Sequence, residues 1–388
     1  MEKVRLGLVG LGNMGKSHRT LLRSGQVPNM ELTAICGRAA TLPEAEPGEE
    51  QFTDVDEMIH SANIDAILIA TPHFSHTTIG IAALNAGLHV CVEKPLSVHK
   101  ADCERLIAAH AARPELVFAA MFQMRTAPLW QEVRKLVRSG QLGTIRRIHW
   151  DCSDWFRSEF YYASGGWRAT WKGEGGGVLL NQCPHHLDLF QWIFGLPQKV
   201  HGFCQFGRYH QIEVEDDVTA YFHFADGSHA VFNTSTGETP GNQRLEIIAD
   251  NGRVTVQPDK ISWIKNLVPM NQWSQETNSG FAKPDTELVE IPVPARTGQH
   301  AEILQNFADA ILHGTPLLTP AAEGLHSIEL ANAILLSSWL GRTIDLPMDA
   351  AHYERELQHR IDTSTFQKKI LDPTKCTVSQ DDFAKSFR

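Results

Sequence analysis

The chain has 388 residues, 42% of them hydrophobic and 21% charged, a composition typical of a globular protein that is long enough for two domains. Its formal net charge of -10 at pH 7, without a cluster of lysines and arginines, disfavours nucleic-acid binding, and no run of about 18 apolar residues predicts a membrane span. Seven scattered cysteines without a C-x-x-C pair argue against a disulfide framework. Because the N-terminus leads straight into a strand-like segment, we expect a cytoplasmic protein. The lack of an apolar run and of a basic cluster leads us to expect no membrane contact and a small-molecule ligand.

A strand, a glycine-rich loop and a helix open the chain. The apolar segment 4–9 ends in Gly10-Leu11-Gly12-Asn13-Met14-Gly15, and helix-compatible residues 16–24 follow. In a dinucleotide-binding fold Gly10 makes the tight turn, Gly12 lets a pyrophosphate approach the backbone, and Gly15 allows close packing of helix on strand. The first helical turn supplies free N–H groups to the phosphate oxygens. We therefore expect this whole loop to bind a nicotinamide dinucleotide; a glycine-rich turn without a ligand is the less favoured alternative.

The residues after the second predicted strand, 31–36, bear on the choice of cofactor. An NAD-preferring fold offers Asp or Glu to the ribose hydroxyls here, but this chain has Gly37 and Arg38. Without a carboxylate to repel a 2'-phosphate, and with a guanidinium to pair with it, the sequence favours NADP over NAD. In the alternative interpretation, Arg38 stacks on the adenine or points to solvent.

Strand and helix patterns continue to alternate, which predicts a parallel, doubly wound sheet. Buried strands are predicted at 64–69 and 89–92, with a helix at 77–86 between them. Ligands of such sheets bind beyond the carboxyl ends of the strands. We expect the polar residues that follow these two strands to face the nicotinamide half of the cofactor: Thr71, Pro72, His73, His76, Glu93 and Lys94.

The domain boundary is predicted near 125–145, after a helix at 101–112 and a strand at 116–120. This gives an α/β Rossmann dinucleotide-binding domain at 1–125 and an α+β substrate-binding and oligomerisation domain at 126–388. The second domain is expected to contain a helix at 128–140, a strand at 145–151, hairpins around Ala225-Asp226-Gly227 and Asp250-Asn251-Gly252, and helices at 300–312 and 321–340. We expect these last two helices to pack on the sheet or on the Rossmann domain. The tail at 372–388 has no clear period.

An irregular stretch, 155–174, is crowded with aromatic and hydrogen-bonding side chains. Sugars present apolar C–H faces and polar edges, and aromatic rings beside polar groups match both. We therefore expect Tyr161, Trp167 and Arg168 to bind substrate. The alternative is an ordinary aromatic-rich core loop.

Taken in order, the glycine loop, Thr71-Pro72 with His76, and Glu93-Lys94-Pro95 resemble the Gfo/Idh/MocA oxidoreductase family, which includes glucose-fructose oxidoreductase and inositol dehydrogenases. The segment 175–188, which begins Gly175-Gly176-Gly177, looks like the family's G-G-G-x-L-x-D-x-G-x-H-x-x-D motif. The resemblance covers residues 4–345. It implies a C-terminal domain with a large, mainly antiparallel open sheet that often makes oligomer contacts, and a substrate bound between the two domains.

The resemblance also implies catalytic roles. Lys94 matches the family's catalytic lysine and His185 its catalytic histidine, whereas Asn181 stands where the inositol dehydrogenase pattern has aspartate. An amide cannot accept a proton, but Asn181 can still hydrogen-bond a substrate hydroxyl, so all three residues are expected to act in catalysis and to bind substrate. Cys183-Pro184 replaces the family's small Gly-x. Apolar spacing places His185 near the start of a helix, whose dipole would lower the histidine pKa.

We predict no metal site. Cys183, His185, His186 and Asp188 are too close together for a structural zinc site, and the sequence shows no partner pair at a suitable interval. Asp188 is expected to cap or pair instead.

The predicted activity is hydride transfer between nicotinamide and a secondary hydroxyl of a sugar, glycoside or cyclitol. In this hypothesis His185 takes the hydroxyl proton, and Lys94 orients the oxygen and shares its proton. Two alternatives stay open: a redox glycosidase acting by transient C3 oxidation and elimination, and a regulator that senses bound dinucleotide. A homodimer or homotetramer through the C-terminal sheet is expected.

Overall fold

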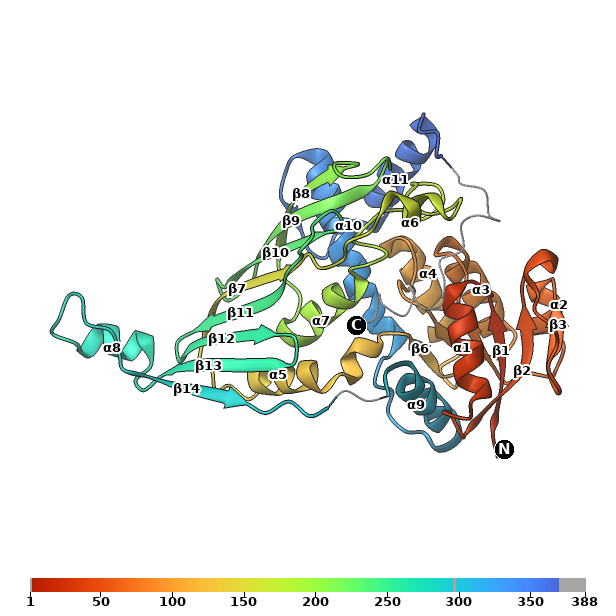
Figure 1. Cartoon of the computed structure of the whole chain (residues 1–388), viewed down its shortest axis with the longest axis horizontal. Coiled ribbons are helices and arrows are strands. Elements are labelled where there is room, and N and C mark those ends of the chain that lie inside the picture. The colour runs from red at the N-terminus through yellow and green to blue at the C-terminus, as the bar shows by residue number, and fades with distance from the viewer. Residues whose placement is uncertain (1, 296–297, 370–388) are drawn as a thin grey trace.

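The computed structural model describes residues 2–295 and 298–369. Its first sheet has six parallel strands in the order β3-β2-β1-β4-β5-β6, the doubly wound order expected for dinucleotide binding (Figure 1). The strands are β1 (Val4–Val9), β2 (Met30–Cys36), β3 (Glu50–Phe52), β4 (Ala66–Ile69), β5 (His89–Val92) and β6 (Phe118–Ala120). The predicted Rossmann sheet is thus confirmed.

Helices bury both faces of this sheet, as parallel strands require. They are α1 (Asn13–Arg23), α2 (Val55–Ile59), α3 (Phe74–Asn85), α4 (Lys100–Ala111) and, from much later in the chain, α9 (Gln299–His313), with a short 3-10 helix at Ala39–Thr41. Leu6 and Leu8 of β1 share a core with Phe307 of α9, while Ile67 of β4 packs in the core that contains Leu106 of α4. Each such buried side chain contributes about 1.5–3 kcal/mol.

The second sheet has nine strands in the order β14-β13-β12-β11-β7-β10-β9-β8-β15. Neighbouring strands are antiparallel except β7 and β10, which confirms the large, mainly antiparallel sheet. The strands are β7 (Ile145–Cys152), β8 (Lys199–Phe206), β9 (Glu215–His223), β10 (His229–Ser235), β11 (Gln243–Ala249), β12 (Gly252–Gln257), β13 (Lys260–Asn266), β14 (Thr286–Ile291) and β15 (Ile344–Asp345). Both predicted hairpins are present, as β9–β10 and β11–β12.

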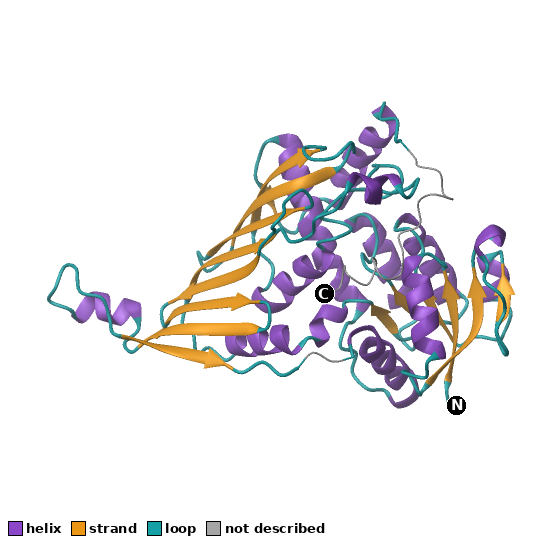
Figure 2. Ribbon diagram, in the orientation of Figure 1, coloured by secondary structure: helices purple, strands orange, loops and turns teal. Residues whose placement is uncertain are grey.

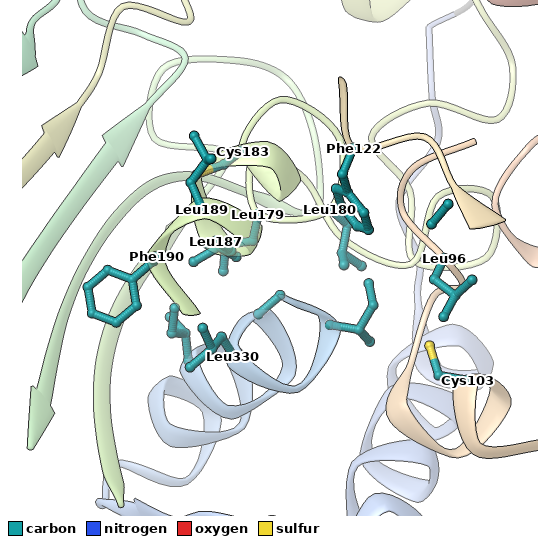
Figure 3. Close-up of a cluster of buried hydrophobic side chains, with 14 of the residues drawn as sticks. Leu96, Cys103, Phe122, Leu179, Leu180, Cys183, Leu187, Leu189, Phe190 and Leu330 are labelled. Carbon is teal, nitrogen blue, oxygen red and sulfur yellow. The ribbon is translucent and has the colours of Figure 1, made fainter. Parts of the chain in front are cut away.

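Three helices lie between the two sheets, on the face of the large sheet that is turned towards the parallel one (Figure 2). They are α5 (Pro128–Arg138), α7 (Pro184–Phe194) and α10 (Gly324–Leu340). Helix α7 begins with Pro184, whose missing N–H costs nothing in a first turn, and ends before Gly195, which has φ 86°. Figure 3 shows Leu187 of α7 packed towards Leu330 of α10, so this apolar core fixes the helix that carries the site.

The remaining helices are shorter or peripheral: α6 (Glu159–Ala163), α8 (Met270–Glu276), α11 (Ala350–Thr363) and 3-10 turns at Gln123–Thr126 and Ala321–Glu323. Helix α8, in the connection between β13 and β14, projects beyond the ends of these strands in Figure 1. In the part of the chain that the structure describes, no helix is both long and apolar enough to cross a membrane. The tail at 372–388 lies outside the described residues.

Two predicted helix starts are late by three residues. Helix α1 begins at Asn13 instead of 16, because its first turn includes the end of the glycine loop and Gly12 is its N-cap. Helix α3 begins at Phe74 instead of 77, so that His76 lies in its first turn. The packing expected for the helices predicted at 300–312 and 321–340 is also confirmed. Helix α9 packs against β1, and helix α10 packs against β8 and α7.

Candidate active site

A cavity of about 1810 Å³ opens beyond the carboxyl ends of β1, β2, β4 and β5 and extends to the large sheet. It is lined by most of the residues expected to bind cofactor or substrate: Gly10, Gly12, Asn13, Met14, Arg38, Thr71, Pro72, His73, Glu93, Lys94, Tyr161, Trp167, Arg168, Asn181 and His185. The fold thus brings together side chains from loops that are far apart in sequence. Gly15 and His76 do not line the cavity.

The glycine loop leaves room for a ligand where the backbone turns into α1. A Cβ on Gly10 (φ 92°) would lie 2.6 Å from the carbonyl oxygen of Ala70, and one on Gly15 would lie 1.9 Å from the oxygen of Gly10. A Cβ on Gly12, in contrast, would meet no protein atom within 4 Å. Gly10 and Gly15 are therefore needed for packing, and Gly12 leaves open space at a helix N-terminus that has no side-chain cap. This arrangement fits the pyrophosphate of a dinucleotide.

His76 has a structural place behind the cavity. Its buried ring lies between two carbonyl oxygens, with Nδ1 2.9 Å from that of Pro95 and Nε2 2.9 Å from that of Thr71. The ring therefore ties the loop after β4 to the loop after β5. His76 shapes the cofactor loops without facing the cavity.

Glu93 is held by a buried partner from α1. Its Oε1 lies 2.6 Å from His18 Nε2, and its Oε2 accepts the backbone N–H of Lys94 at 3.1 Å. Although burial opposes ionisation, the hydrogen bond from His18 and the charges of His18 and Lys94 leave the pKa of Glu93 below its usual value. A negative charge therefore lies directly beside the predicted catalytic lysine.

Lys94 reaches across the cavity to the segment before α7. Its Nζ donates a 2.8 Å hydrogen bond to the backbone oxygen of Asn181. Burial lowers the pKa of Lys94 to about 8; Glu93 raises it, and Arg168 lowers it further. Both protonation states of this amine are accessible near neutral pH, which suits a group that shares a proton.

His185 lies in the first turn of α7, as expected, and its pKa is low. Burial is the largest cause, and the positive charge of Lys94 follows; both lower the pKa of His185 well below its usual value. The expected direction of the shift is confirmed, and burial is its largest cause. His185 Nε2 lies 3.1 Å from Nε2 of Gln123, whose amide can rotate to accept or donate as the imidazole requires.

Asn181 and the aromatic loop close the substrate side of the cavity. The Asn181 amide donates to a buried carboxylate, Glu174. Arg168 donates to the Tyr161 hydroxyl at 2.8 Å, and its guanidinium lies 4.7 Å from the Tyr161 ring centre and 4.6 Å from that of Trp167. The three predicted substrate residues thus form one contiguous surface facing the cavity.

Sequence reasoning missed three residues that contact the site. Gln123 follows the last strand of the parallel sheet, a position that could have been recognised as a ligand-facing end. Glu174 stands in the irregular stretch before the glycines, where no periodic signal assigns it a partner. Lys368, from the last described segment, donates to the carbonyl oxygens of Gly165 and Arg168 in the aromatic loop, and nothing in its sequence surroundings indicates this.

The cysteine and histidine cluster differs from the expectation in one respect. Cys152 of β7 lies beside Cys183 and His186, and their potential ligand atoms are within 4.8 Å of one another, so Cys183 does have a partner from elsewhere in the chain. Burial, followed by the contact with Cys183, raises the pKa of Cys152 well above its usual value, which keeps the thiol protonated and opposes metal binding. Asp188 pairs with Arg125 through two hydrogen bonds of 2.7 and 2.6 Å, as expected.

Comparison with known proteins agrees with this geometry. Residues 4–121 match a family model described as an oxidoreductase family with an NAD-binding Rossmann fold, and residues 130–255 match the GFO/IDH/MocA C-terminal domain. The chain belongs to the Gfo/Idh/MocA oxidoreductase family. It is 30% identical over 348 residues to the uncharacterized oxidoreductase YdgJ of Escherichia coli, a match that covers 85% of this chain and 94% of that protein.

Other members of the Gfo/Idh/MocA family match over less of their length. An inositol 2-dehydrogenase of Corynebacterium glutamicum is 31% identical over 201 residues, which is 50% of this chain and 55% of that relative. An inositol 2-dehydrogenase of Salmonella typhimurium is 28% identical over 151 residues, which is 38% of this chain and 45% of that relative. The chain thus spans about half the length of these relatives.

Among solved structures, the WlbA dehydrogenase of Bordetella pertussis in complex with NADH and UDP-GlcNAcA has a TM-score of 0.75 at 27% identity, covering 89% of this chain and all of that one. Levoglucosan dehydrogenase with NADH and L-sorbose, at 20% identity and TM-score 0.73 over 90% of this chain, shares the fold.

Proposed function

We propose that this protein is an NAD(P)-dependent dehydrogenase that acts on a secondary hydroxyl of a sugar, glycoside or cyclitol. The observation that carries the proposal is the convergence of Lys94, Asn181 and His185 on the cavity into which the glycine loop opens. When bound, the nicotinamide supplies the hydride acceptor or donor. The names of the inositol, WlbA and levoglucosan dehydrogenases support a sugar-like substrate.

The protein's own residues move the proton. A neutral His185 can take the proton of the substrate hydroxyl, because its lowered pKa keeps it uncharged at neutral pH. Lys94, anchored on the backbone of Asn181, donates to the same oxygen and shares its proton, since its pKa of about 8 makes both states available. Tyr161 and Trp167 offer rings to the C–H face of a sugar, and Arg168 fixes their arrangement.

Arg38 supports NADP as the preferred cofactor. It lines the cavity directly after β2, where no carboxylate stands to repel a 2'-phosphate. NADH in the WlbA and levoglucosan dehydrogenase structures supports NAD as the alternative.

A redox glycosidase is the second candidate, favoured by the absence of a carboxylate at position 181 and by the aromatic loop. Transient oxidation at C3 would acidify the C2 proton, the aglycone would leave by elimination, and water addition followed by return of the hydride would restore the cofactor. Such an enzyme releases aglycone without net cofactor reduction, and this separates it from a dehydrogenase.

The outer face of the large sheet supports a homodimer or homotetramer. The strand pairing places Phe203, Tyr221, Ile264 and Leu288 on one face, and they are 62%, 42%, 37% and 65% exposed. Exposed apolar side chains of this size are the observation that supports an interaction surface on this face. Light scattering coupled to size exclusion tests it: a monomer at micromolar concentration would contradict the assembly.

An absorbance screen at the reduced-nicotinamide band tests the activity. NAD and NADP are each incubated with inositols, free hexoses and simple glycosides, and aglycone release is followed in parallel. We expect reduction with one substrate class. Aglycone release without cofactor reduction would support the glycosidase instead of the dehydrogenase. Tight cofactor binding without reduction and without aglycone release would support a regulator that senses bound dinucleotide.

A further inference from the structure

A buried carboxylate lies directly behind the substrate side of the cavity. Glu174 is 1% exposed and does not line the cavity. Its Oε1 accepts from the side-chain amide of Asn181, and its Oε2 accepts the backbone N–H of Ala169 at 2.5 Å. Arg168 lies 4.0 Å from Oε1. Among the described residues, the hydrogen bonds and the ion pair of this carboxylate are thus with the substrate loop and with Asn181.

The carboxylate determines which way the Asn181 amide points. Burial raises the pKa of Glu174, whereas the charge of Arg168 and the hydrogen bonds from Ala169 and Asn181 favour its ionised form. An ionised carboxylate can only accept hydrogen bonds, so in that form Asn181 turns its NH2 group towards Glu174. Its Oδ1 is then the atom left for a ligand, because Asn181 lines the cavity and no described residue donates to this oxygen. With Glu174 ionised, Asn181 therefore offers an acceptor to a substrate hydroxyl and no donor, whereas the sequence alone allowed both.

Glu174 also places negative charge close to the lysine. Lys94 binds the backbone oxygen of Asn181 while Glu174 binds the side chain of the same residue. The charge of Glu174 raises the pKa of Lys94, in opposition to burial and to Arg168. Residue 181 therefore connects the carboxylate to the amine, although it carries no charge itself.

We propose that Glu174 is a positioning residue that fixes Asn181 as a hydrogen-bond acceptor for the substrate hydroxyl and supplies, one side chain away, the negative charge that position 181 lacks. This inference rests on the proposed function, because it assigns a role within the same site. A carboxylate that only stabilised the loop through Ala169 would act on folding and leave the titration of Lys94 unchanged.

Three variants separate these roles: Glu174→Gln, Asn181→Asp and the double variant that carries both. Glu174→Gln removes the charge and replaces one acceptor oxygen by an NH2 group. With the remaining oxygen on the Ala169 N–H, the Asn181 amide turns over to accept from this NH2 and directs its own NH2 group at the cavity. We expect kcat to fall by about 10- to 100-fold, as when the outer partner of a reacting group is removed. KM should change less than kcat. The double variant returns a carboxylate next to Lys94 and should recover most of the lost kcat.

The titration of Lys94 gives a readout that needs no substrate. It is followed by NMR of the lysine side chains on the full chain, with the resonance assigned from Lys94→Met. We expect Glu174→Gln to lower the pKa of Lys94 and the double variant to raise it again. An unchanged titration in Glu174→Gln, or a loss of kcat that Asn181→Asp does not restore in the double variant, overturns the proposal.

Asn181→Asp alone keeps the proposal testable if Glu174→Gln does not fold. The new carboxyl would face Glu174 at hydrogen-bond distance, and two such groups cannot both ionise easily. We expect one of them to stay protonated at neutral pH, visible as an additional carboxylic-acid band in the infrared difference spectrum; absence of this band shows that the two groups do not interact and overturns the proposal. If the wild-type protein transfers no hydride, the proposed function fails, while the Lys94 titration still decides whether Glu174 acts on this amine.

Discussion

Replacement of Gly12 by alanine tests the dinucleotide site by adding a single methyl group. The added Cβ meets no protein atom within 4 Å, so the free protein has space for it. Gly12 is the N-cap of α1 and has no side-chain cap to lose, so we expect the free energy of unfolding to fall by less than about 1 kcal/mol. The same space is where a pyrophosphate would approach the backbone.

The cost to binding follows from the hydrogen bonds that the methyl group blocks. A hydrogen bond to a charged acceptor contributes about 1.5–3 kcal/mol, and about 1.4 kcal/mol changes the dissociation constant tenfold. Loss of one phosphate contact should therefore weaken dinucleotide binding by about 10- to 100-fold. Calorimetric titration with NADPH and NADH measures the constant, and chemical denaturation measures stability.

Two further glycines serve as controls. Gly280→Ala makes the same chemical change in open space away from the cavity and should leave both binding and stability unchanged. Gly15→Ala places its Cβ 1.9 Å from the oxygen of Gly10 and should impair folding. Dinucleotide binding by Gly12→Ala at the wild-type constant would refute the assignment of this loop to the pyrophosphate.

Three further predictions concern the cofactor, the buried ion pair and pH. Arg38→Asp should favour NAD over NADP, because a carboxylate repels the 2'-phosphate; an unchanged ratio of the two dissociation constants would show that Arg38 does not contact this group. Asp188→Asn leaves the buried Arg125 with Glu323 as its one charged partner among the described residues and should lower the free energy of unfolding by about 3 kcal/mol, whereas a change below about 1 kcal/mol in urea denaturation would contradict this account. Since the pKa of Lys94 is lowered to about 8, its neutral form predominates above that pH. The value of kcat/KM for oxidation should therefore rise through pH 8, and that for reduction should fall. If both values changed in the same direction with pH, Lys94 would be excluded as the shared proton site.

The sequence predicts best those features that local chemistry determines. The β1 strand, the glycine loop and α1 are recognisable because the turn at Gly10 requires a positive φ and the helix must pack closely at Gly15. The β9–β10 hairpin is recognisable because Asp226-Gly227 is a turn signal between two alternating segments. Lys94 and His185 were found through motifs, and the fold brings both to the same cavity.

Contacts between side chains of irregular segments or distant elements could not be predicted. Glu174 and Asn181 are only seven positions apart, but the turns between them have no period from which a shared direction could be inferred. Gln123 and His185, 62 positions apart, meet because α7 packs between the two sheets. His76 was expected to face the cofactor, but the earlier start of α3 turns its ring inwards.

Turnover of Lys94→Ala and His185→Ala with the substrate found in the screen tests the central claim most directly. Both variants must first bind dinucleotide as the wild type does, so that a loss of turnover reflects proton transfer. We predict that kcat for hydride transfer falls by at least about 100-fold in each variant. Full turnover in either one would contradict the proposed mechanism and exclude that residue from the reaction.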